Sequence, residues 1–386
     1  MSVLLVLVLC QADPLIQEMV NSVSSDSILF NVQRLQDFVD RSWWSDSCDA
    51  AAEWIYNRFI DYGLDSVYHD TITWDPLVPP NIVGILTGTI YPDSVYAVLC
   101  AHFDAINETT PEPLAPGADD NASGVAAVLE AVRILKEYQF EYNIRFIAVS
   151  AEEYPLLGSH YYAYMADQRG DDIVAAFNTD MIGYVDMQPE SLEVCGDTFC
   201  EPLVDYFIAC SDTYTTTYTR RRLGCQVGDG GAFAVHGWQT VSLIADVFPD
   251  VNPYRHSPAD TIGAGFNNLE FCTTSIKSII AALASRSRPC GICESNSTYR
   301  NICRLMVKPN PVMDDGFIDF SIAKNGIAHI RLYNIVGQLS KEILNDYRLA
   351  GNYQIYLNTD GLSQGTYILI METNGEKITK SIIVVR

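Results

Sequence analysis

The sequence predicts an α/β domain with a mixed, mostly parallel central sheet and helices on both faces, followed by a small β-sandwich. Up to about residue 285, strand-like stretches alternate with helix-like stretches, which is the pattern of a sheet covered by helices. The run Val95–Ala101 is continuously apolar, as expected for a strand buried on both faces. After about residue 300 the helices give way to short alternating strands separated by Gly and Asn turns.

Two helices and three strands are predicted in the first hundred residues. The helices cover 14–41 and 45–62, and the strands cover 67–73, 82–86 and 95–101. An apolar stripe along each helix predicts the face that packs inward. Gly63 is placed to end the second helix, because glycine readily adopts the left-handed conformation that follows a helix.

Helices and strands alternate in the remainder of this domain. The predicted order is a helix through Val125 and Leu135, a strand at 144–149, a helix at 158–167, a strand at 173–177, a helix at 202–212, a strand at 241–244 and a helix at 269–284. The strands predicted for the sandwich are 317–322, 328–333, 353–357, 367–372 and 378–385.

The charge of the chain limits the partners it can have. Its 386 residues carry a formal net charge of -24, which disfavours nucleic acid and anionic membranes because both attract clusters of Lys and Arg. From Leu305 to Arg386, eight Lys and Arg balance eight Asp and Glu, so the excess acid lies upstream. Two bodies of different composition therefore meet near residue 300.

The N-terminus has the features of a secretory signal. The apolar run Val3–Leu9 is too short to span a bilayer, and cleavage after Ala12 fits the small-residue preference of signal peptidases. We therefore expect residues 1–12 to be a signal peptide, and the mature chain to be exported without a transmembrane segment.

The cysteine count is compatible with disulfides in an oxidising compartment. Of eleven cysteines, ten remain when Cys10 leaves with the signal, although the sequence does not fix their pairing. The pair Cys290 and Cys293 lacks a second close pair, so a disulfide is favoured there over a structural zinc site.

The stretch Pro116–Gly124 has the composition of a metal-binding turn. It holds Asp119 and Asp120 between glycines, directly before a predicted helix. An Asp pair at such a position usually only caps the helix, so further ligand candidates are needed to support metal binding.

Polar side chains that follow the predicted strands supply those candidates. His102 and Asp104 end one strand, Glu152 and Glu153 end the next, Asp180 follows a third, and His256 follows a fourth by a loop. The carboxyl ends of parallel strands face a common crevice, so these side chains are expected to converge. Acids gathered this closely repel one another unless cations neutralise them, and His with carboxylate suits zinc. The remaining histidines are expected to be ordinary hydrogen-bonding residues: His69, His160, His236 and His329.

Five sequence blocks resemble the secreted di-zinc aminopeptidase family, whose best-known members are bacterial leucine aminopeptidases. The blocks are Ala101-His102-Phe103-Asp104, Pro116-Gly117-Ala118-Asp119-Asp120-Asn121-Ala122-Ser123-Gly124, Ala151-Glu152-Glu153, Asn178-Thr179-Asp180-Met181 and Asn252-Pro253-Tyr254-Arg255-His256-Ser257. They occur in the order of that family. The resemblance implies a zinc exopeptidase-like fold for residues 13–288, acting on peptides with a free N-terminus.

The resemblance also implies two zinc ions per chain and the residues that bind them. Asp120 would bridge the two ions. His102 and Asp180 would complete one site, and Glu153 and His256 would complete the other. Two such ions lower the pKa of a shared water toward roughly 7 and stabilise an oxyanion at the scissile carbonyl.

Glu152 would then be the general base, and Asp104 would hold the ring of His102. Adjacent residues on a strand point to opposite faces, so Glu152 and Glu153 can both reach the site only if the strand breaks there. Pro155 is consistent with such a break.

The chain departs from the family at Gly228-Asp229-Gly230-Gly231, where many relatives carry Ser-Asp-His. This departure removes no implied metal ligand, but it affects the expected substrate contacts. The nearby run Arg220–Arg222 could bind the C-terminal carboxylate of a peptide, although a solvated loop is the favoured interpretation.

Residues 305–386 resemble the sorting domain of the type IX secretion system. The motifs that carry the resemblance are Lys308-Pro309-Asn310-Pro311, Leu332-Tyr333-Asn334, Ala350-Gly351, Leu362-Ser363-Gln364-Gly365-Thr366-Tyr367 and the strand with Lys380. The resemblance implies export through the periplasm of a Gram-negative bacterium to the cell surface or medium, with that secretion machinery as a partner. Residues 289–304 are predicted to be a cysteine-containing linker, and a binding β-sandwich is the alternative for the module.

Two other functions are compatible with the first domain. One is a glutaminyl cyclase on the same fold, which would carry a single zinc. The other is a binding ectodomain without catalysis, which the presence of Glu152 and all five ligand candidates argues against.

Overall fold

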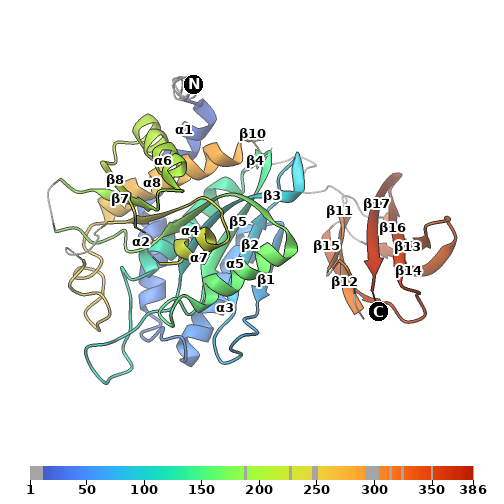
Figure 1. Cartoon of the computed structure of the whole chain (residues 1–386), viewed down its shortest axis with the longest axis horizontal. Coiled ribbons are helices and arrows are strands. Elements are labelled where there is room, and N and C mark those ends of the chain that lie inside the picture. Colours follow the sequence, from blue (N-terminus) through green and yellow to red (C-terminus); the bar gives the residue numbers. More distant parts are fainter. Residues whose placement is uncertain are drawn as a thin grey trace. The chain divides into compact units, whose positions relative to one another are not determined.

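The computed structural model describes residues 12–186, 189–225, 228–245, 251–292, 304–308, 310–312, 315–322, 326–348 and 351–385. The predicted signal peptide therefore lies almost entirely outside the described residues. The chain divides into two compact units, Met1–Ile292 and Cys293–Arg386. Figure 1 shows helices and a central sheet in the first unit and strands alone in the second.

An eight-stranded mixed sheet forms the centre of the first unit, in the order β1-β2-β5-β3-β6-β9-β7-β8. Its strands are β1 (Ser66–Asp70), β2 (Asn81–Leu86), β3 (Tyr91–His102), β5 (Tyr142–Val149), β6 (Asp172–Thr179), β7 (Leu192–Gly196), β8 (Thr219–Leu223) and β9 (Thr240–Ile244). The four central strands, β5, β3, β6 and β9, run parallel. Strand β2 joins β5 antiparallel, and β7 joins β9 antiparallel, so the predicted mixed sheet with a parallel core is confirmed.

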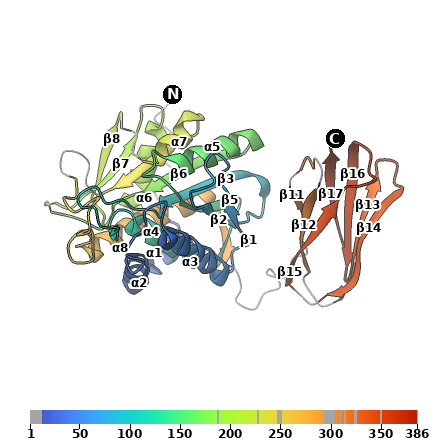
Figure 2. The ribbon, with the colours of Figure 1, turned by 90° about the horizontal axis from the view of Figure 1, so that it is seen from below.

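Helices cover both faces of this sheet, as predicted (Figure 2). They are α1 (Pro14–Asn21), α2 (Ser25–Gln36), α3 (Asp46–Tyr62), α4 (Ala122–Leu135), α5 (Leu157–Arg169), α6 (Glu201–Tyr214), α7 (Gly230–Val235) and α8 (Leu269–Ser287). Side chains of α5 and α7 pack on one face with Val98 and Ile147. The other helices share a larger core on the opposite face with Leu99 and Phe146. Every residue of α4 except Arg133 is buried, so this helix is a central support of the domain.

Local sequence signals explain several helix ends. The Ser45 side chain accepts a hydrogen bond from the backbone N–H of Cys48 and begins α3, and Gly63 ends that helix with a φ of 79°. The predicted helix 14–41 is instead two helices. Ser24 caps the second one through the N–H of Ser27, and the chain leaves the helix after Gln36.

The remaining differences from the sequence-based prediction involve short elements in the first unit and, in the second unit, the unpredicted strand Leu339–Arg348. Strands β7 and β8 and helix α7 were not predicted. The run Arg220–Arg222, expected in a solvated loop, lies in β8 at an edge of the sheet. The first part of the predicted linker forms β10 (Pro289–Ile292), which pairs with β4 (Tyr138–Phe140), because backbone pairing continues beyond α8. Residues 293–303 lie outside the described residues.

The second unit is a β-sandwich of two antiparallel sheets, in the orders β11-β12-β15 and β14-β13-β16-β17. The strands are β11 (Arg304–Lys308), β12 (Asp315–Ile322), β13 (Gly326–Asn334), β14 (Leu339–Arg348), β15 (Gly351–Asn358), β16 (Gly365–Thr373) and β17 (Glu376–Val384). Apolar residues of both sheets share one core, including Phe320 and Leu357 from the first sheet and Leu332 and Leu369 from the second. This confirms the predicted sandwich.

The eight cysteines in the described residues all carry free thiols, so the expected disulfides do not appear among them. Cys195 lies beside Cys225, and burial together with a hydrogen bond to that thiol raises the pKa of Cys195. Cys293 and Cys303 are outside the described residues. None of the described helices combines the length and apolar character needed to cross a membrane.

Candidate metal centre

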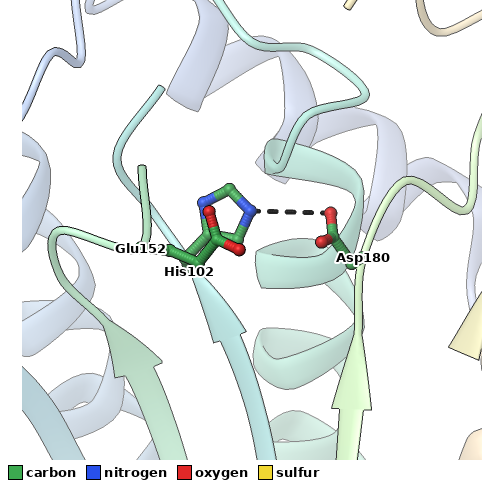
Figure 3. A group of neighbouring side chains, drawn as sticks. All are labelled: His102, Glu152 and Asp180. Atoms are coloured by element: carbon green, nitrogen blue, oxygen red, sulfur yellow. Dashed lines mark ion pairs between the residues drawn. The ribbon is translucent and has the colours of Figure 1, made fainter. Parts of the chain in front are cut away.

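The candidate site lies at the carboxyl edge of the parallel strands. His102 is the last residue of β3, Asp180 directly follows β6, and Glu152 follows β5 by a short turn. Figure 3 shows these three side chains meeting from neighbouring strand ends, with an ion pair between His102 and Asp180. Asp120 approaches from the turn before α4. The convergence predicted from the strand ends is therefore present.

The chain leaves the extended conformation after β5, which is needed for both Glu152 and Glu153 to reach the site. Ala151 has a φ of 52° and Leu156 a φ of 58°, so the backbone leaves the extended conformation on either side of Glu152 and Glu153. The carboxylate of Asp104 accepts hydrogen bonds from the backbone N–H groups of both glutamates, each at 3.1 Å. This turn directs both glutamate side chains toward the crevice.

Asp120 lies between the two histidines. Its Oδ1 is 3.4 Å from Nε2 of His102, and its Oδ2 is 3.3 Å from Nε2 of His256. His102 Nε2 is also 3.5 Å from Oδ1 of Asp180, and His256 Nε2 is 3.1 Å from Oε1 of Glu153. Each histidine thus faces one carboxylate of its own and one oxygen of the shared Asp120.

Two groups of ligand atoms result, each within 4.8 Å of one another. One is formed by His102, Glu152 and Asp180, and the other by Asp120, Glu153 and His256. The first group contains Glu152 in addition to the two residues expected there. Since Asp120 also contacts His102, all five predicted ligands and the predicted base lie at one place.

Each histidine is held through its other ring nitrogen. Nδ1 of His102 is 3.1 Å from the backbone carbonyl of Asp104 and 3.6 Å from its carboxylate Oδ1. The Asp104 backbone, more closely than its side chain, therefore orients the ring. Nδ1 of His256 is 2.9 Å from Oε2 of Glu108. With Nδ1 engaged, both imidazoles present Nε2 to the crevice.

Within the described residues, the atoms that face the crevice lack hydrogen-bond partners, although they face one another at ion-pair distance. These buried atoms are Nε2 of His102, Nε2 of His256, Oε1 of Glu153 and Oδ1 of Asp180. Buried polar atoms are normally paired, so a set of unpaired atoms aimed at one place calls for a further partner. Imidazole nitrogens and carboxylate oxygens are donors that fit a divalent cation such as zinc.

Burial and mutual charge shift the pKa values within the site. Burial would lower the pKa of His102, but the charges of Glu152 and Asp180 raise it well above its ordinary range. Burial would also lower the pKa of His256, but its close contacts with the carboxylates of Asp120 and Glu153 outweigh burial and raise the pKa to about 10. Burial, followed by the charge of Asp120, raises the pKa of Glu153 to about 7. The negative charge of the carboxylates thus favours positive charge at this place.

A second layer of buried groups fixes the turn that carries Asp120. The carboxylate of Asp260 accepts hydrogen bonds from the backbone N–H groups of Asp119 and Asp120, at 3.0 and 2.9 Å. The Asp119 side chain turns away from the crevice and accepts from the Gly183 N–H and the Asn252 amide. Of the Asp pair in this turn, only Asp120 therefore faces the histidines.

Arg41 supports the same turn and was missed in the sequence. Its buried guanidinium donates to the carbonyls of Phe103, Leu35, Pro116 and Gly117. An isolated arginine at the end of a predicted helix gives no signal of burial, since most arginines are exposed. The contacts join the strand end that carries His102 to the turn that carries Asp120.

Residues 228–231, where the sequence departs from the pattern of the aminopeptidase family, lie against the site. A Cβ atom on Gly228, whose φ is 55°, would come within 3.4 Å of Asp180 Oδ2 and Glu152 Oε1. Asp229 is buried beside it, and burial together with the charge of Asp180 raises its pKa to about 7. Arg255, also unpredicted, places its Nε 3.4 Å from Oδ2 of Asp120.

Other candidates lie away from the site. The arginines of β8 pair with local acids: Arg220 contacts Glu193 at 3.1 Å, and Arg221 contacts Asp205 at 2.7 Å. His69 contacts Glu53 at 2.7 Å, and His236 contacts Asp167 at 3.4 Å. None of these residues belongs to either ligand group of the described chain.

Comparison with known proteins gives a family for each of the two units. Residues 81–269 match the Peptidase family M28, and residues 306–385 match the Secretion system C-terminal sorting domain. A probable leucine aminopeptidase of Arthroderma otae is 30% identical over 266 residues, which are 65% of this chain and 70% of that protein. Leucine aminopeptidase 1 of Fusarium vanettenii is 27% identical, covering 66% of this chain and 68% of that protein.

Solved structures with a similar fold include the Legionella pneumophila LapA aminopeptidase. It has a TM-score of 0.63 at 23% identity, over 70% of this chain and 73% of that one. The glutaminyl cyclase of Bacteroides thetaiotaomicron has a TM-score of 0.56 at 20% identity, over 68% of this chain and 97% of that one. At these identities the likeness concerns the fold.

A zinc exopeptidase-like fold that brings paired histidines and carboxylates to its sheet edge defines a metallopeptidase, a hydrolase. The chain belongs to peptidase family M28, and it carries a sorting domain of the type IX secretion system at its C-terminal end.

Proposed function

We propose that this metallopeptidase is an exported aminopeptidase that removes N-terminal residues from peptides with two zinc ions. The observation that carries the proposal is the position of Asp120, whose two carboxylate oxygens face two different histidines. A carboxylate shared in this way suits a site for a pair of cations.

In this proposal His102 and Asp180 would hold one ion, Glu153 and His256 would hold the other, and Asp120 would be shared by both. Their unpaired, buried nitrogen and oxygen atoms support this ligand set. Glu152 lies in the first ligand group as well, but it contacts neither histidine at ion-pair distance among the described contacts, whereas Asp120 contacts both. This difference leaves Glu152 for proton transfer.

When bound, zinc supplies Lewis acidity, which lowers the pKa of water and stabilises negative charge on the scissile carbonyl oxygen. Glu152 accepts the proton that the attacking water loses, and then donates it to the nitrogen of the leaving amine. Burial, together with the charges of Asp229 and Asp180, raises the pKa of Glu152 well above its ordinary range. A carboxyl group with a raised pKa is suited to accept a proton and to return it.

Asp104 acts as a positioning residue. Its backbone carbonyl contacts Nδ1 of His102, and its carboxylate holds the backbone of Glu152 and Glu153. One residue thereby fixes a ligand of the first ion, a ligand of the second ion and the base relative to one another.

The preference for a free N-terminus rests on the relatives, which include leucine aminopeptidases of two fungi. Glutaminyl cyclase remains the alternative, since one such enzyme shares the fold. The presence of a second ligand group, Asp120, Glu153 and His256, favours the hydrolase with two ions over a cyclase with one.

The sorting domain supports export of the peptidase. In the proposed route the chain crosses the periplasm of a Gram-negative bacterium, and the type IX machinery moves it to the surface or the medium. Removal of residues 305–386 would then follow passage across the outer membrane.

The proposed activity is tested with one peptide sequence in three forms: free, N-acetylated and C-amidated. We expect the zinc-loaded full chain to release the first residue from the free and C-amidated forms and to leave the N-acetylated form intact. Cleavage of the N-acetylated form at the rate of the free form would overturn the aminopeptidase assignment. Conversion of an N-terminal Gln peptide to its cyclised form without hydrolysis would favour the cyclase.

A further inference from the structure

Three aromatic side chains form an exposed surface that adjoins the turn of Glu152 and Glu153. The ring of Trp43 stacks on Tyr154 with centroids 4.3 Å apart and planes inclined by 27°. Trp44 meets Trp43 edge to face, with centroids 4.9 Å apart. Trp44 is 59% exposed and Tyr154 is 40% exposed. We refer to Trp43, Trp44 and Tyr154 as the aromatic platform.

From this arrangement we propose that the aromatic platform binds the side chain of the residue that follows the scissile bond, and that it gives the enzyme a preference for apolar, above all aromatic, residues there. The proposal rests on the aminopeptidase function proposed above. It adds a substrate-specificity site to that function.

The platform is tied by the backbone to the proposed catalytic groups. Tyr154 comes two residues after Glu152, so their Cα atoms are at most about 7.6 Å apart, because consecutive Cα atoms are 3.8 Å apart. Trp43 follows two residues after Arg41, whose guanidinium is anchored to the Gly117 carbonyl at 2.8 Å. The platform therefore joins two loops that the site already fixes.

Packing holds the platform in place. Trp43 is half-buried and packs against a small core that contains Ile72, Val78 and Ala151, and Ala151 directly precedes Glu152. The backbone N–H of Leu157 donates to the Tyr154 carbonyl at 3.2 Å, where α5 begins. An exposed aromatic pair on a rigid base loses little conformational freedom when a ligand binds, which favours a binding role.

The chemistry of the reaction determines which part of the substrate lies nearest the platform. Glu152 donates a proton to the leaving amine, so that nitrogen must come within hydrogen-bond distance of its carboxylate, about 3 Å. The Cα atom of the following residue is bonded to that nitrogen. Its side chain therefore begins within a few ångströms of Glu152, on the part of the substrate that departs, and Tyr154 is the nearest exposed aromatic residue along the chain.

The site offers this side chain an apolar contact in acidic surroundings. Aromatic rings pair favourably in offset or edge-to-face arrangements, and the platform presents an exposed ring on each side of Trp43. A glycine after the scissile bond has no side chain and makes no such contact. We expect the stacking to change kcat/KM by roughly three- to tenfold.

The test compares three tripeptides that differ only in the second residue: Leu-Phe-Ala, Leu-Leu-Ala and Leu-Gly-Ala. Release of the first Leu by the zinc-loaded full chain gives kcat/KM for each. The wild-type enzyme is expected to favour Phe over Gly roughly three- to tenfold, with Leu between them. Trp44→Ala and Tyr154→Ala are each expected to lower the Phe-to-Gly ratio toward one, while Tyr154→Phe retains it.

Trp74→Ala is the matched control. Trp74 is also an exposed aromatic residue, at 51%, and packs edge to face on Tyr161, but it does not contact any of the three platform rings through a ring pair. The Phe-to-Gly ratio of this variant is expected to equal that of the wild type. Thermal unfolding of all variants shows whether each one is folded.

The outcomes separate the two proposals. An unchanged Phe-to-Gly ratio in Trp44→Ala and Tyr154→Ala, with Leu still released, would overturn the platform as a specificity site and assign the exposed rings to another occupant, such as a protein partner. Equal wild-type cleavage of the Phe and Gly peptides would overturn it as well. Failure of the wild-type enzyme to release Leu from all three peptides would instead contradict the proposed function.

Discussion

Oδ1 of Asp104 accepts a hydrogen bond from the backbone N–H of Glu152 at 3.1 Å. This contact joins the end of β3 to the turn after β5, two strands that are neighbours in the sheet. The other carboxylate oxygen accepts from Glu153 at 3.1 Å. The position of Glu152, the proposed base, therefore depends on Asp104, which is not one of the proposed metal ligands.

Replacement of Asp104 by Asn tests that dependence. An amide has a single oxygen, so its NH2 group would face one of the two backbone N–H donors, and the turn would lose a buried hydrogen bond. We expect zinc affinity or kcat/KM to fall by about 10- to 100-fold. Competition with a chelator gives the zinc affinity, and peptide hydrolysis gives the rate.

Asp75→Asn is the control for this substitution. Asp75 also accepts a backbone N–H, that of Leu77 at 3.1 Å, but at an exposed turn away from the site. Its zinc affinity and kcat/KM should equal those of the wild type. Wild-type behaviour of Asp104→Asn would mean that the turn is held by other contacts.

Replacement of Glu152 by Gln tests its role in proton transfer. The amide keeps the shape of the side chain but cannot accept a proton, so kcat should fall by about 10²- to 10⁴-fold or more. Zinc content, measured by elemental analysis after dialysis, should stay nearly unchanged. Loss of bound zinc instead of kcat alone would identify Glu152 as a ligand. Glu137→Gln, a change on the surface, should leave both quantities unaltered.

Chelation followed by titration tests the number of ions. Removal of the metal should abolish hydrolysis, and added zinc should restore it as two ions bind per chain. His256→Ala should lower the stoichiometry to one ion, because it removes a ligand from one site only, and Asp120→Asn should weaken both sites. A wild-type stoichiometry of one ion would favour the cyclase-like alternative. His236→Ala, which affects a histidine paired with Asp167, should retain two ions.

Replacement of Arg41 tests the support beneath the site. Met in this position would take the only described donor from the buried carbonyls of Phe103 and Pro116. The Leu35 and Gly117 carbonyls would keep backbone N–H donors. An unpaired buried polar group costs about 1–3 kcal/mol, so the free energy of unfolding of the first unit should fall by at least about 2 kcal/mol. Urea denaturation followed by tryptophan fluorescence measures the change.

Arg41→Lys is the companion variant. An ammonium carries its donors on one atom and cannot reach carbonyls spread around a planar guanidinium, so this variant should recover only part of the lost stability. Arg34→Met, at the end of the neighbouring helix α2, should have little effect. Equal urea midpoints for Arg41→Met and the wild type would show that the carbonyls find other donors.

Much of the architecture follows from local signals in the sequence. Ser45 and Gly63 mark the ends of α3, and the apolar run before His102 marks a buried strand. Strands β7 and β8 escaped prediction because each is short, and because the three arginines of β8 do not show the alternation of a half-buried strand. These strands form through pairing with neighbours, which is a property of the folded sheet.

The candidate ligands could be found from the sequence because each stands at the end of a strand or beside a glycine-bounded turn. The residues that support these ligands could not be found from the sequence. Arg41 and Asp260 look like surface charges in the sequence, and burial gives them their roles. The same holds for Trp43 and Tyr154, which are 111 positions apart and meet only after folding.

By itself, the sequence determined the order of most strands and helices, the identity of the histidines and carboxylates, and the presence of a second, β-rich unit. Hydrophobic period, caps and short motifs depend on residues that are near neighbours along the chain. Only the tertiary structure decided that Asp119 turns away while each oxygen of Asp120 faces a histidine, and that Asp104 holds the backbone of both glutamates. Such relationships depend on the directions of side chains from distant segments, and packing of the whole domain fixes those directions.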